Sequence, residues 1–255
     1  MKGGQDLKVI AVANQKGGVG KTTTLINLGA YLADLGQRVL LIDLDPQGNA
    51  TSGLGLAKAA PGIYNVLLDP LTLTEAVVPT EVPGLSMVVS TEDLAGAEIE
   101  LVLQGHRELR LKESLSVKLP FDYVMIDCPP SLGLLTLNAL AAADSVLVPI
   151  QCEYYALEGV SQLLKTIERV RQGINPLIQI EGVVLTMFDG RTNLSIQVAD
   201  EVKRYFRGKV YGSVVPRNVR LSEAPSHGLP ISRYDAKSRG AEVYLELAKE
   251  VLGVE

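Results

Sequence analysis

Short, continuously apolar runs rich in Val, Ile and Leu recur along this chain, separated by stretches with helical periodicity. The runs predict strands at residues 7–14, 37–43, 85–90, 121–127, 145–150, 180–187 and 209–215. Because apolar and polar residues do not alternate in these runs, both faces of each strand must be covered, as in a parallel sheet between two layers of helices. Helices are predicted at residues 20–35, 92–116, 133–142, 156–172, 193–207 and 239–252. The sequence therefore predicts an α/β fold with one doubly wound, mostly parallel sheet.

The length of the chain, 255 residues, suffices for one large α/β domain, and no linker-like segment or internal repeat divides it. We therefore expect a single domain over residues 1–255. The first residues, MKGGQDLK, lack the apolar run of a signal peptide. The longest apolar-rich stretch, residues 132–150, is interrupted by Asn138 and Asp144, which indicates a buried helix and strand instead of a membrane span. These features favour a cytoplasmic protein.

A glycine-rich segment, KGGVGKTT, joins the first predicted strand to the first predicted helix. In this context the glycines let backbone N–H groups point at phosphate oxygens, and the helix N-terminus adds positive potential. Lys21 is expected to bridge the β- and γ-phosphates, and the Thr22 hydroxyl to bind Mg²⁺. Gln15 stands where the strict GxxxxGKT pattern has its first glycine, and a glycine-rich turn with an incidental lysine is the alternative. The candidate nucleotide-binding residues here are Lys16, Gly17, Gly18, Val19, Gly20, Lys21, Thr22 and Thr23.

Three aspartates end predicted strands: Asp43 and Asp45 in LLIDLDPQGN, and Asp127 in VMIDCPPS. Ligands of open parallel sheets bind outside the carboxyl ends of the strands, so these side chains are expected to meet beside the glycine loop. Asp127 is expected to hold Mg²⁺ directly or through water, as a Walker-B carboxylate does. One of Asp43 and Asp45 can hold the loop or a water near Mg²⁺, and the other can orient the attacking water. Alternatively, each aspartate only caps a turn.

Charge is distributed unevenly along the chain. The net charge is −5, but residues 186–240 hold ten Lys and Arg against five Asp and Glu. An acidic body with a basic C-terminal portion is compatible with an anionic partner of that portion. Scattered surface arginines without a common function are the alternative.

Together these motifs resemble the deviant Walker A ATPases of the MinD/ParA superfamily, and within it the ParA (Soj)-type partitioning ATPases. The resemblance continues through EYYALEGV (153–160), LTMFDGRTNLS (185–195), VPRNVRLSEAPSHGLPI (215–231) and SRGAEVY (238–244), and so spans nearly the whole chain in order.

The resemblance implies roles for residues of the phosphate loop and its neighbours. It implies that Lys16 reaches across an ATP-bound homodimer to the partner's nucleotide, in the manner of an arginine finger supplied in trans. It also implies that the two backbones approach closely at Gly17, so that a side chain there blocks dimerisation. Asp45 resembles the residue that positions the hydrolytic water, and Asp43 is supportive. The implied catalytic residues are Lys16, Lys21 and Asp45, and the implied metal-binding residues are Thr22, Asp45 and Asp127.

The C-terminal segments carry further implied contacts. The resemblance places Pro216 and Asn218 at the adenine with Met187 near them, and it includes Arg217 among the nucleotide-binding residues. The absence of an NKxD motif favours ATP over GTP. It implies that Arg191 and Arg220 bind DNA without sequence preference, within the basic span described above. Stabilisation of a helix end by Arg220 is the alternative.

The function that these implications describe is a weak, Mg²⁺-dependent ATPase that acts as a dimerising switch on the nucleoid. The ATP-bound homodimer would bind DNA, and a ParB-type centromere-binding partner would stimulate hydrolysis and thereby drive chromosome or plasmid segregation.

Three other functions share the phosphate loop. A MinD-like membrane ATPase needs a basic amphipathic C-terminal helix, whereas residues 241–255 hold one lysine and four glutamates, so stable membrane binding is not expected. An iron-protein reductase needs cluster-binding cysteines, but Cys128 and Cys152 stand alone and are expected to be reduced core residues. A P-loop small-molecule kinase or synthetase needs an acceptor pocket and a basic lid, which the sequence does not indicate.

Overall fold

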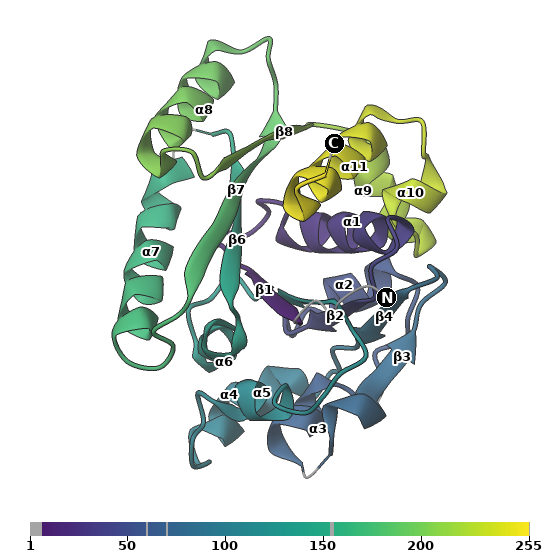
Figure 1. The fold of residues 1–255 in the computed structure, drawn as a ribbon, viewed down its shortest axis with the longest axis vertical. Coiled ribbons are helices and arrows are strands. Elements are labelled where there is room, and N and C mark those ends of the chain that lie inside the picture. The colour runs from purple at the N-terminus through teal and green to yellow at the C-terminus, as the bar shows by residue number, and fades with distance from the viewer. Residues whose placement is uncertain (1–6, 60, 70, 154–155, 255) are drawn as a thin grey trace.

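The computed structural model of the protein describes residues 7–59, 61–69, 71–153 and 156–254. Within them an eight-stranded sheet has the order β3-β4-β2-β5-β1-β6-β7-β8 (Figure 1). The strands are β1 Lys8–Val12, β2 Val39–Asp43, β3 Val77–Pro79, β4 Leu85–Val88, β5 Tyr123–Asp127, β6 Ser145–Gln151, β7 Gln179–Phe188 and β8 Val210–Pro216. All neighbouring strands are parallel except β3 and β4. The predicted α/β class and mostly parallel sheet are confirmed.

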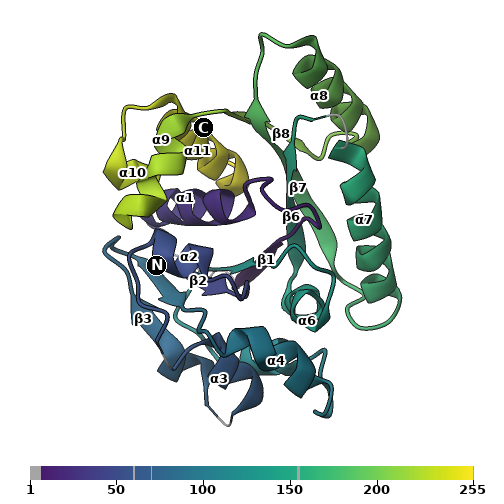
Figure 2. The same ribbon diagram turned by 180° about the vertical axis from the view of Figure 1, so that it is seen from behind.

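Helices cover both faces of this sheet (Figures 1 and 2). The helices are α1 Lys21–Asp34, α2 Asn49–Gly53, α3 Ile63–Leu68, α4 Leu94–Leu101, α5 Arg110–Ser114, α6 Leu134–Ala142, α7 Ala156–Gln172, α8 Asn193–Phe206, α9 Val219–Glu223, α10 Ile231–Tyr234 and α11 Arg239–Leu252, with 3₁₀ turns η1 Leu73–Ala76 and η2 Ala224–His227. Residues 154 and 155, within the segment EYYALEGV, lie outside the described residues.

Burial on both faces explains why the strands read as continuous apolar runs. In β1, Val9 and Ala11 belong to the core beneath α3–α8, whereas Ile10 and Val12 belong to the core beneath α1 and α11. Every residue of β5 is buried. A polar side chain within such a strand would lose its hydration without gaining a partner, so polar groups concentrate where the strands end.

The prediction of one long helix over residues 92–116 is wrong, because this segment forms two short helices, α4 and α5, with turns between them. His106, in the break, has a left-handed backbone with φ of 54°. The buried Asn138 of α6 holds the break: its Nδ2 donates to Arg107 O at 2.7 Å, and its Oδ1 accepts from Leu111 N at 3.1 Å. A buried amide needs such partners, and here it finds them in the backbone of this segment. The short antiparallel edge strand β3 was also not predicted.

Both cysteines are buried and free, as predicted. Burial raises the pKa of both thiols, that of Cys152 to about 11, so neither is a thiolate at neutral pH. Among the described residues, no helix combines the length and the apolar composition needed to cross a membrane.

We expect the substitution Asn138→Ala to lower the free energy of unfolding by about 2–3 kcal/mol, because it leaves Leu111 N without its acceptor and opens a small void. Gln104→Ala, an exposed change in the same break, should alter the free energy by less than about 0.5 kcal/mol. Urea unfolding of the two variants measures both values. Equal stabilities would contradict the role given to Asn138.

Candidate functional site: a nucleotide cavity at the carboxyl ends of the strands

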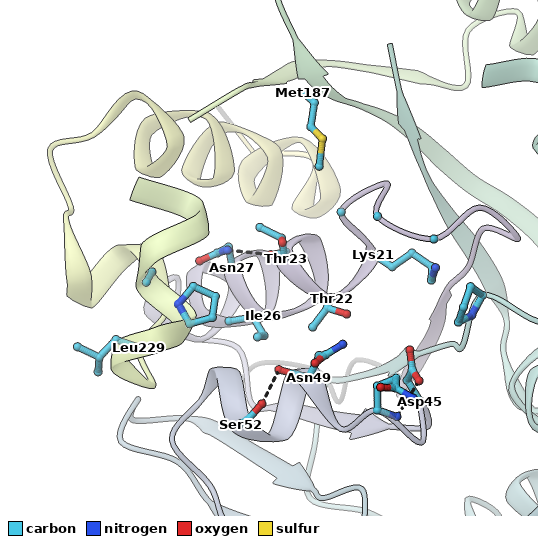
Figure 3. A pocket seen from close by; sticks show the side chains of 17 residues that line it. Lys21, Thr22, Thr23, Ile26, Asn27, Asp45, Asn49, Ser52, Met187 and Leu229 are labelled. Carbon is cyan, nitrogen blue, oxygen red and sulfur yellow. Dashed lines mark hydrogen bonds between the residues drawn. The ribbon is translucent and has the colours of Figure 1, made fainter. Parts of the chain in front are cut away.

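The glycine loop, the aspartates and several predicted base contacts converge at the carboxyl edge of the sheet. A cavity of about 510 Å³ opens there (Figure 3). The predicted residues that line it are Gly17, Gly18, Gly20, Lys21, Thr22, Thr23, Asp45 and Met187. Its lining also includes residues that the sequence did not single out, namely Ile26, Asn27, Gln47, Asn49, Ser52, Pro130, Ala224, Pro225 and Leu229.

The shape of the glycine loop depends on two of its three glycines. Gly18 and Gly20 have φ of 74° and 86°, a left-handed backbone that glycine adopts without the steric cost of a Cβ. Asn14 anchors the entry of the loop: its Nδ2 donates to Pro149 O at 2.7 Å, and its Oδ1 accepts from Lys16 N at 3.1 Å. Val19 is buried and does not line the cavity, but its carbonyl accepts a hydrogen bond from Thr186 at 2.8 Å. The loop is therefore fixed from β6 and β7 at once.

Lys21 begins α1 and is almost fully buried. Its Nζ lies 3.3 Å from Lys16 O, so the side chain folds back along the inside of the loop. Burial lowers the pKa of Lys21, while the nearby Asp127, Cys128 and Asp45 oppose that shift. A poorly hydrated ammonium beside exposed backbone N–H groups favours binding of a polyanion, because the anion replaces the lost solvation.

Asp43 and Asp127 end adjacent strands and pair with each other in the parallel register of β2 and β5. Both are fully buried, and burial raises the pKa of each, that of Asp43 to about 6. Mutual repulsion adds to the shift in Asp127. Two neighbouring buried carboxylates are therefore costly in their charged form at neutral pH, unless a cation is close.

The environment of Asp127 fits a magnesium ion. Thr22 Oγ1 donates to Asp127 Oδ2 at 2.7 Å, so the hydroxyl and the carboxylate are together. The other oxygen, Oδ1, is buried and has no hydrogen-bond partner among the described residues. Within those residues no group of three or more His, Cys, Asp or Glu could hold a metal alone. The hydroxyl of Thr22 and the carboxylate of Asp127 are ligands that suit Mg²⁺, which takes one or two protein oxygens and completes its shell with water and phosphate.

Asp43 and Asp45 point in different directions. Asp43 Oδ2 accepts from both the backbone N and the hydroxyl of Thr51, each at 2.7 Å, and so holds the loop that follows β2. Asp45 lines the cavity, and its Oδ1 accepts from Gln47 N at 3.0 Å. Of the two roles left open by the sequence, the structure therefore gives loop support to Asp43 and leaves Asp45 facing the cavity.

A second cavity of about 420 Å³ adjoins the first, and the two share Gly20, Thr23, Met187 and Pro225 as lining residues. The predicted base contacts Met187, Pro216, Arg217 and Asn218 all line it, together with apolar residues such as Val215 and Leu221. Met187 has φ of 51°, an uncommon conformation for a residue with a Cβ. The bend turns its side chain toward the phosphate loop (Figure 3).

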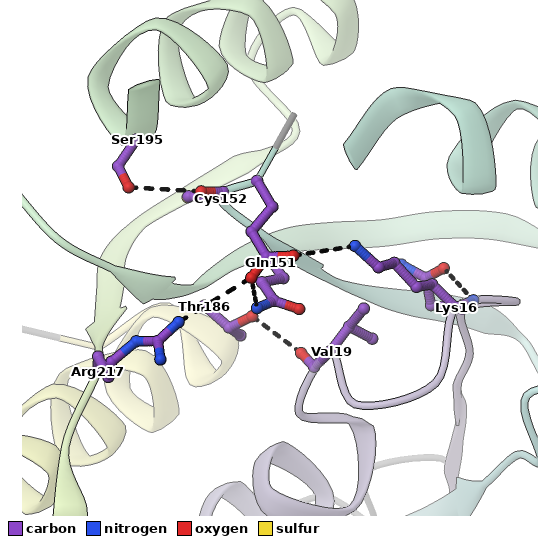
Figure 4. A network of polar contacts seen from close by, with 9 residues as sticks. Lys16, Val19, Gln151, Cys152, Thr186, Ser195 and Arg217 are labelled. Atoms are coloured by element: carbon purple, nitrogen blue, oxygen red, sulfur yellow. Dashed lines mark hydrogen bonds and ion pairs between the residues drawn. The ribbon is translucent and has the colours of Figure 1, made fainter. Parts of the chain in front are cut away.

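Lys16 does not line the cavity of its own chain. Its Nζ lies 3.2 Å from Glu153 Oε2, just beyond β6 (Figure 4). Arg217 NH2 approaches Glu153 Oε1 at 4.0 Å, and the Gln151 amide also donates to this carboxylate. Glu153 was missed by the sequence reasoning, because no local pattern marks a carboxylate that gathers cations from two distant segments.

The two arginines of the basic span are exposed and each is paired with carboxylates. Arg191, whose side chain is 90% exposed, forms a two-pronged contact with Asp189 at 2.8 and 2.7 Å. Hydrogen bonds from Arg191 hold the pKa of Asp189 down at about 2. Arg220 contacts Glu223 at 2.9 Å and Asp235 at 3.4 Å. Neither arginine lines either cavity.

A glycine loop between β1 and α1, with aspartates on the adjacent strand ends of a parallel sheet, defines a P-loop nucleotide-binding protein. The family described as AAA domain matches residues 7–180. The Soj protein of Bacillus subtilis, called sporulation initiation inhibitor, is 63% identical over 247 residues, which cover 96% of this chain and 98% of that protein. The chromosome partitioning protein ParA of Caulobacter vibrioides (strain NA1000 / CB15N) is 54% identical over 254 residues, 98% of this chain and 95% of that protein. The chain belongs to the ParA/Soj family of chromosome-partitioning ATPases.

Solved structures agree on the fold. A Mycobacterium smegmatis protein named cobyrinic acid a,c-diamide synthase, with bound ADP and magnesium, is 42% identical and superposes with a TM-score of 0.85 over 96% of this chain and 94% of that one. MinD of Pyrococcus horikoshii, complexed with Mg-ADP, is 24% identical, with a TM-score of 0.79 over 96% of both chains. At that identity the MinD likeness shows the fold alone.

We expect Asp127→Asn to raise the thermal midpoint of the nucleotide-free protein at pH 7 by roughly 3–8 °C. The pKa of Asp127 is raised by folding, so its contribution to stability is fully present below the unfolded pKa and is lost as the pH rises through the folded pKa. A neutral amide avoids that loss. Differential scanning calorimetry measures the midpoint.

Mg-ATP should stabilise the Asp127→Asn variant much less than it stabilises the wild type. In the variant the unpaired carboxylate oxygen Oδ1, which suits the cation, is replaced by an atom of a neutral amide. Asp93→Asn, an exposed change, should leave both quantities unchanged. An Asp127→Asn protein that Mg-ATP stabilises as strongly as the wild type would contradict the magnesium assignment.

Proposed function

We propose that residues 1–255 form one ATPase domain that binds Mg-ATP, dimerises around it, binds DNA as the dimer and releases DNA after hydrolysis. A ParB-type centromere-binding partner stimulates the hydrolysis, and the cycle segregates a chromosome or plasmid along the nucleoid. The observation that carries the proposal is the nucleotide cavity, built from the motifs named above, in a chain 63% identical to Soj over 96% of its length.

The two adjoining cavities suit the two ends of ATP. Backbone N–H groups of the glycine loop and Lys21 bind the phosphates, and the apolar second cavity takes the adenine with Met187, Pro216 and Asn218. Thr22 and Asp127 would hold Mg²⁺, with Asp45 nearby, and the ion would neutralise charge on the phosphate oxygens. Asp45 orients the water that attacks the γ-phosphorus, and the products are ADP and phosphate.

The proposed dimer is supported by Lys16 and Gly17, whose surroundings within a single chain give no reason for a lysine and a glycine at these positions. Lys16 does not line its own cavity, and Glu153 holds it by an exposed ion pair, a kind of contact worth only about 0–1 kcal/mol. A Cβ at Gly17 would meet nothing within 4 Å, and its φ is not in the left-handed region. A requirement for glycine at this position would therefore come from outside the chain. Both facts support Lys16 acting on the nucleotide of a second copy across a close contact at Gly17.

The MinD-like alternative is opposed by the packing of the C-terminal helix. The apolar face of α11 is buried, through residues such as Val243, Tyr244 and Leu247, against α1 and β8. It is therefore not free to enter a bilayer interface, and its exposed glutamates would be repelled by anionic lipid. We propose that the protein does not bind membranes stably.

A synthetase function is the second candidate, because a solved relative at 42% identity carries the name of a synthase. The curated relatives at 63% and 54% identity are Soj and ParA proteins, and they favour the partitioning function.

Size-exclusion chromatography and DNA binding, each with ATP, ADP or no nucleotide, test the proposed cycle. We expect the dimer and the DNA complex to appear together with ATP alone. A monomer that binds no DNA in the presence of ATP would refute the switch and favour the synthetase function instead.

Gly17→Val gives the sharper version of this experiment. It should abolish the ATP-dependent dimer while the monomer still binds ATP and keeps its unfolding midpoint, because a Cβ at this position meets nothing within 4 Å in the single chain. The matched control is Gly18→Val, where φ of 74° strains the new residue and should weaken ATP binding itself. Dimerisation of Gly17→Val at wild-type protein concentrations would remove the close contact from the mechanism.

The DNA interface can be tested from both sides of one ion pair. Arg191→Ala should weaken retention of DNA by the ATP dimer about tenfold or more and flatten its salt dependence. Asp189→Asn removes the carboxylate charge that faces Arg191 but keeps the oxygen that accepts Arg191 N, so it should strengthen retention. Filter binding across a salt series measures both. If both variants shift affinity in the same direction, or neither does, Arg191 is not a DNA contact.

A further inference from the structure

The loop that carries Asp45 is held by a chain of hydrogen bonds that runs away from the cavity. Asp45 N donates to Asp43 Oδ1 at 3.3 Å, and Asp45 O accepts from Gly48 N at 2.8 Å. A third contact comes from a different strand: Ser90, just beyond β4, donates its hydroxyl to Asp45 O at 2.9 Å. The position of Asp45 therefore depends on groups that lie outside its own turn.

Thr51, in α2, joins these contacts into one network. Its hydroxyl donates to Asp43 Oδ2 at 2.7 Å and at the same time accepts from Ser90 N at 3.0 Å. Its backbone N donates to the same Asp43 oxygen. Asp43, Thr51 and Ser90 are all fully buried, so water cannot replace a missing partner at low cost.

The network ties two segments that are far apart in the sequence. Asp43 ends β2 and residues 44–51 follow it, whereas Ser90 follows β4, which lies beside β2 in the sheet. Without the Thr51 hydroxyl, Ser90 N would lose its acceptor and Asp43 would lose one of its two donors on Oδ2. The turn that carries Asp45 would then be fixed to the sheet through fewer contacts, although no residue that lines the nucleotide cavity would have changed.

We propose that Thr51 is a positioning residue for ATP hydrolysis: its hydroxyl, between Asp43 and Ser90, fixes Asp45 at the distance and angle that the attacking water requires. Ser90 completes the same arrangement through its contact with the Asp45 carbonyl. The inference rests on the proposed function, because it assumes that Asp45 orients the water. Displacement of a group by about 1 Å can cost a hundredfold in rate.

The test compares Thr51→Val, which keeps the shape and removes the hydroxyl, with Thr51→Ser, which keeps the hydroxyl and removes a methyl group. Steady-state phosphate release at saturating DNA and over a range of Mg-ATP concentrations gives kcat and KM. For Thr51→Val we expect kcat to fall about tenfold or more, while KM and the affinity for ADP stay within about twofold, since Asp45 is not a phosphate-binding group. Thr51→Ser should restore kcat to within about threefold of the wild type.

A purely structural role for Thr51 predicts a different result, namely a lower unfolding midpoint with kcat and KM of the folded fraction unchanged. That result, or a Thr51→Val kcat within twofold of the wild type, overturns the proposal. Should Thr51→Val fail to fold, Ser90→Ala takes its place, because it removes only the hydroxyl that contacts Asp45 O. We expect its kcat to fall about threefold at unchanged KM, and an unchanged kcat overturns the proposal equally.

Asp45→Ala separates failure of this inference from failure of the proposed function. If Asp45→Ala hydrolyses ATP normally, the assigned role of Asp45 is wrong and Thr51 has nothing to position. If Asp45→Ala is inactive while Thr51→Val has normal kcat, the proposed function stands and only the role of Thr51 is refuted.

Discussion

The close approach of Asp43 and Asp127 at the ends of β2 and β5 is the constraint on which the rest of the site depends. The parallel register places the two carboxylates side by side, and burial makes their charges costly. The surrounding groups offset that cost in different ways: Thr51 donates two hydrogen bonds to Asp43, and Thr22 donates one to Asp127. One oxygen of Asp127 has no hydrogen-bond partner among the described residues, which suits a cation that arrives with a phosphate chain.

The residues of the phosphate loop face two different places, the nucleotide cavity and the protein surface beside Glu153. Gly18, Gly20 and Lys21 face the cavity inside the chain, and hydrogen bonds with Pro149 of β6 and Thr186 of β7 hold the loop that carries them. Lys16, a few residues earlier, pairs instead with Glu153 at the protein surface. A weak, partly exposed ion pair can exchange for a stronger one with a phosphate, as the proposed role of Lys16 on the nucleotide of a second copy requires.

Much of the fold and part of the site could be predicted from the sequence because the signals are local. Continuous apolar runs predicted the parallel strands, and their aspartate ends predicted which edge carries the polar groups. The prediction of one helix over residues 92–116 failed because a residue far along the chain, Asn138, holds the break: it donates to Arg107 O and accepts from Leu111 N. Glu153 and Ser90 were missed for the same reason, since each acts through a partner from a distant segment.

The sequence by itself determined the α/β class, the position of the glycine loop between a strand and a helix, and the family to which the chain belongs. Residues close together in the sequence encode those features, because their spacing reflects the geometry of one strand or one turn. Only the tertiary structure decided that Asp43 holds its loop through Thr51, that the Asp45 side chain lines the cavity, and that Lys16 pairs with Glu153. Strand order and side-chain direction arise from packing across the sheet, and no local pattern encodes which distant group a buried charge will meet.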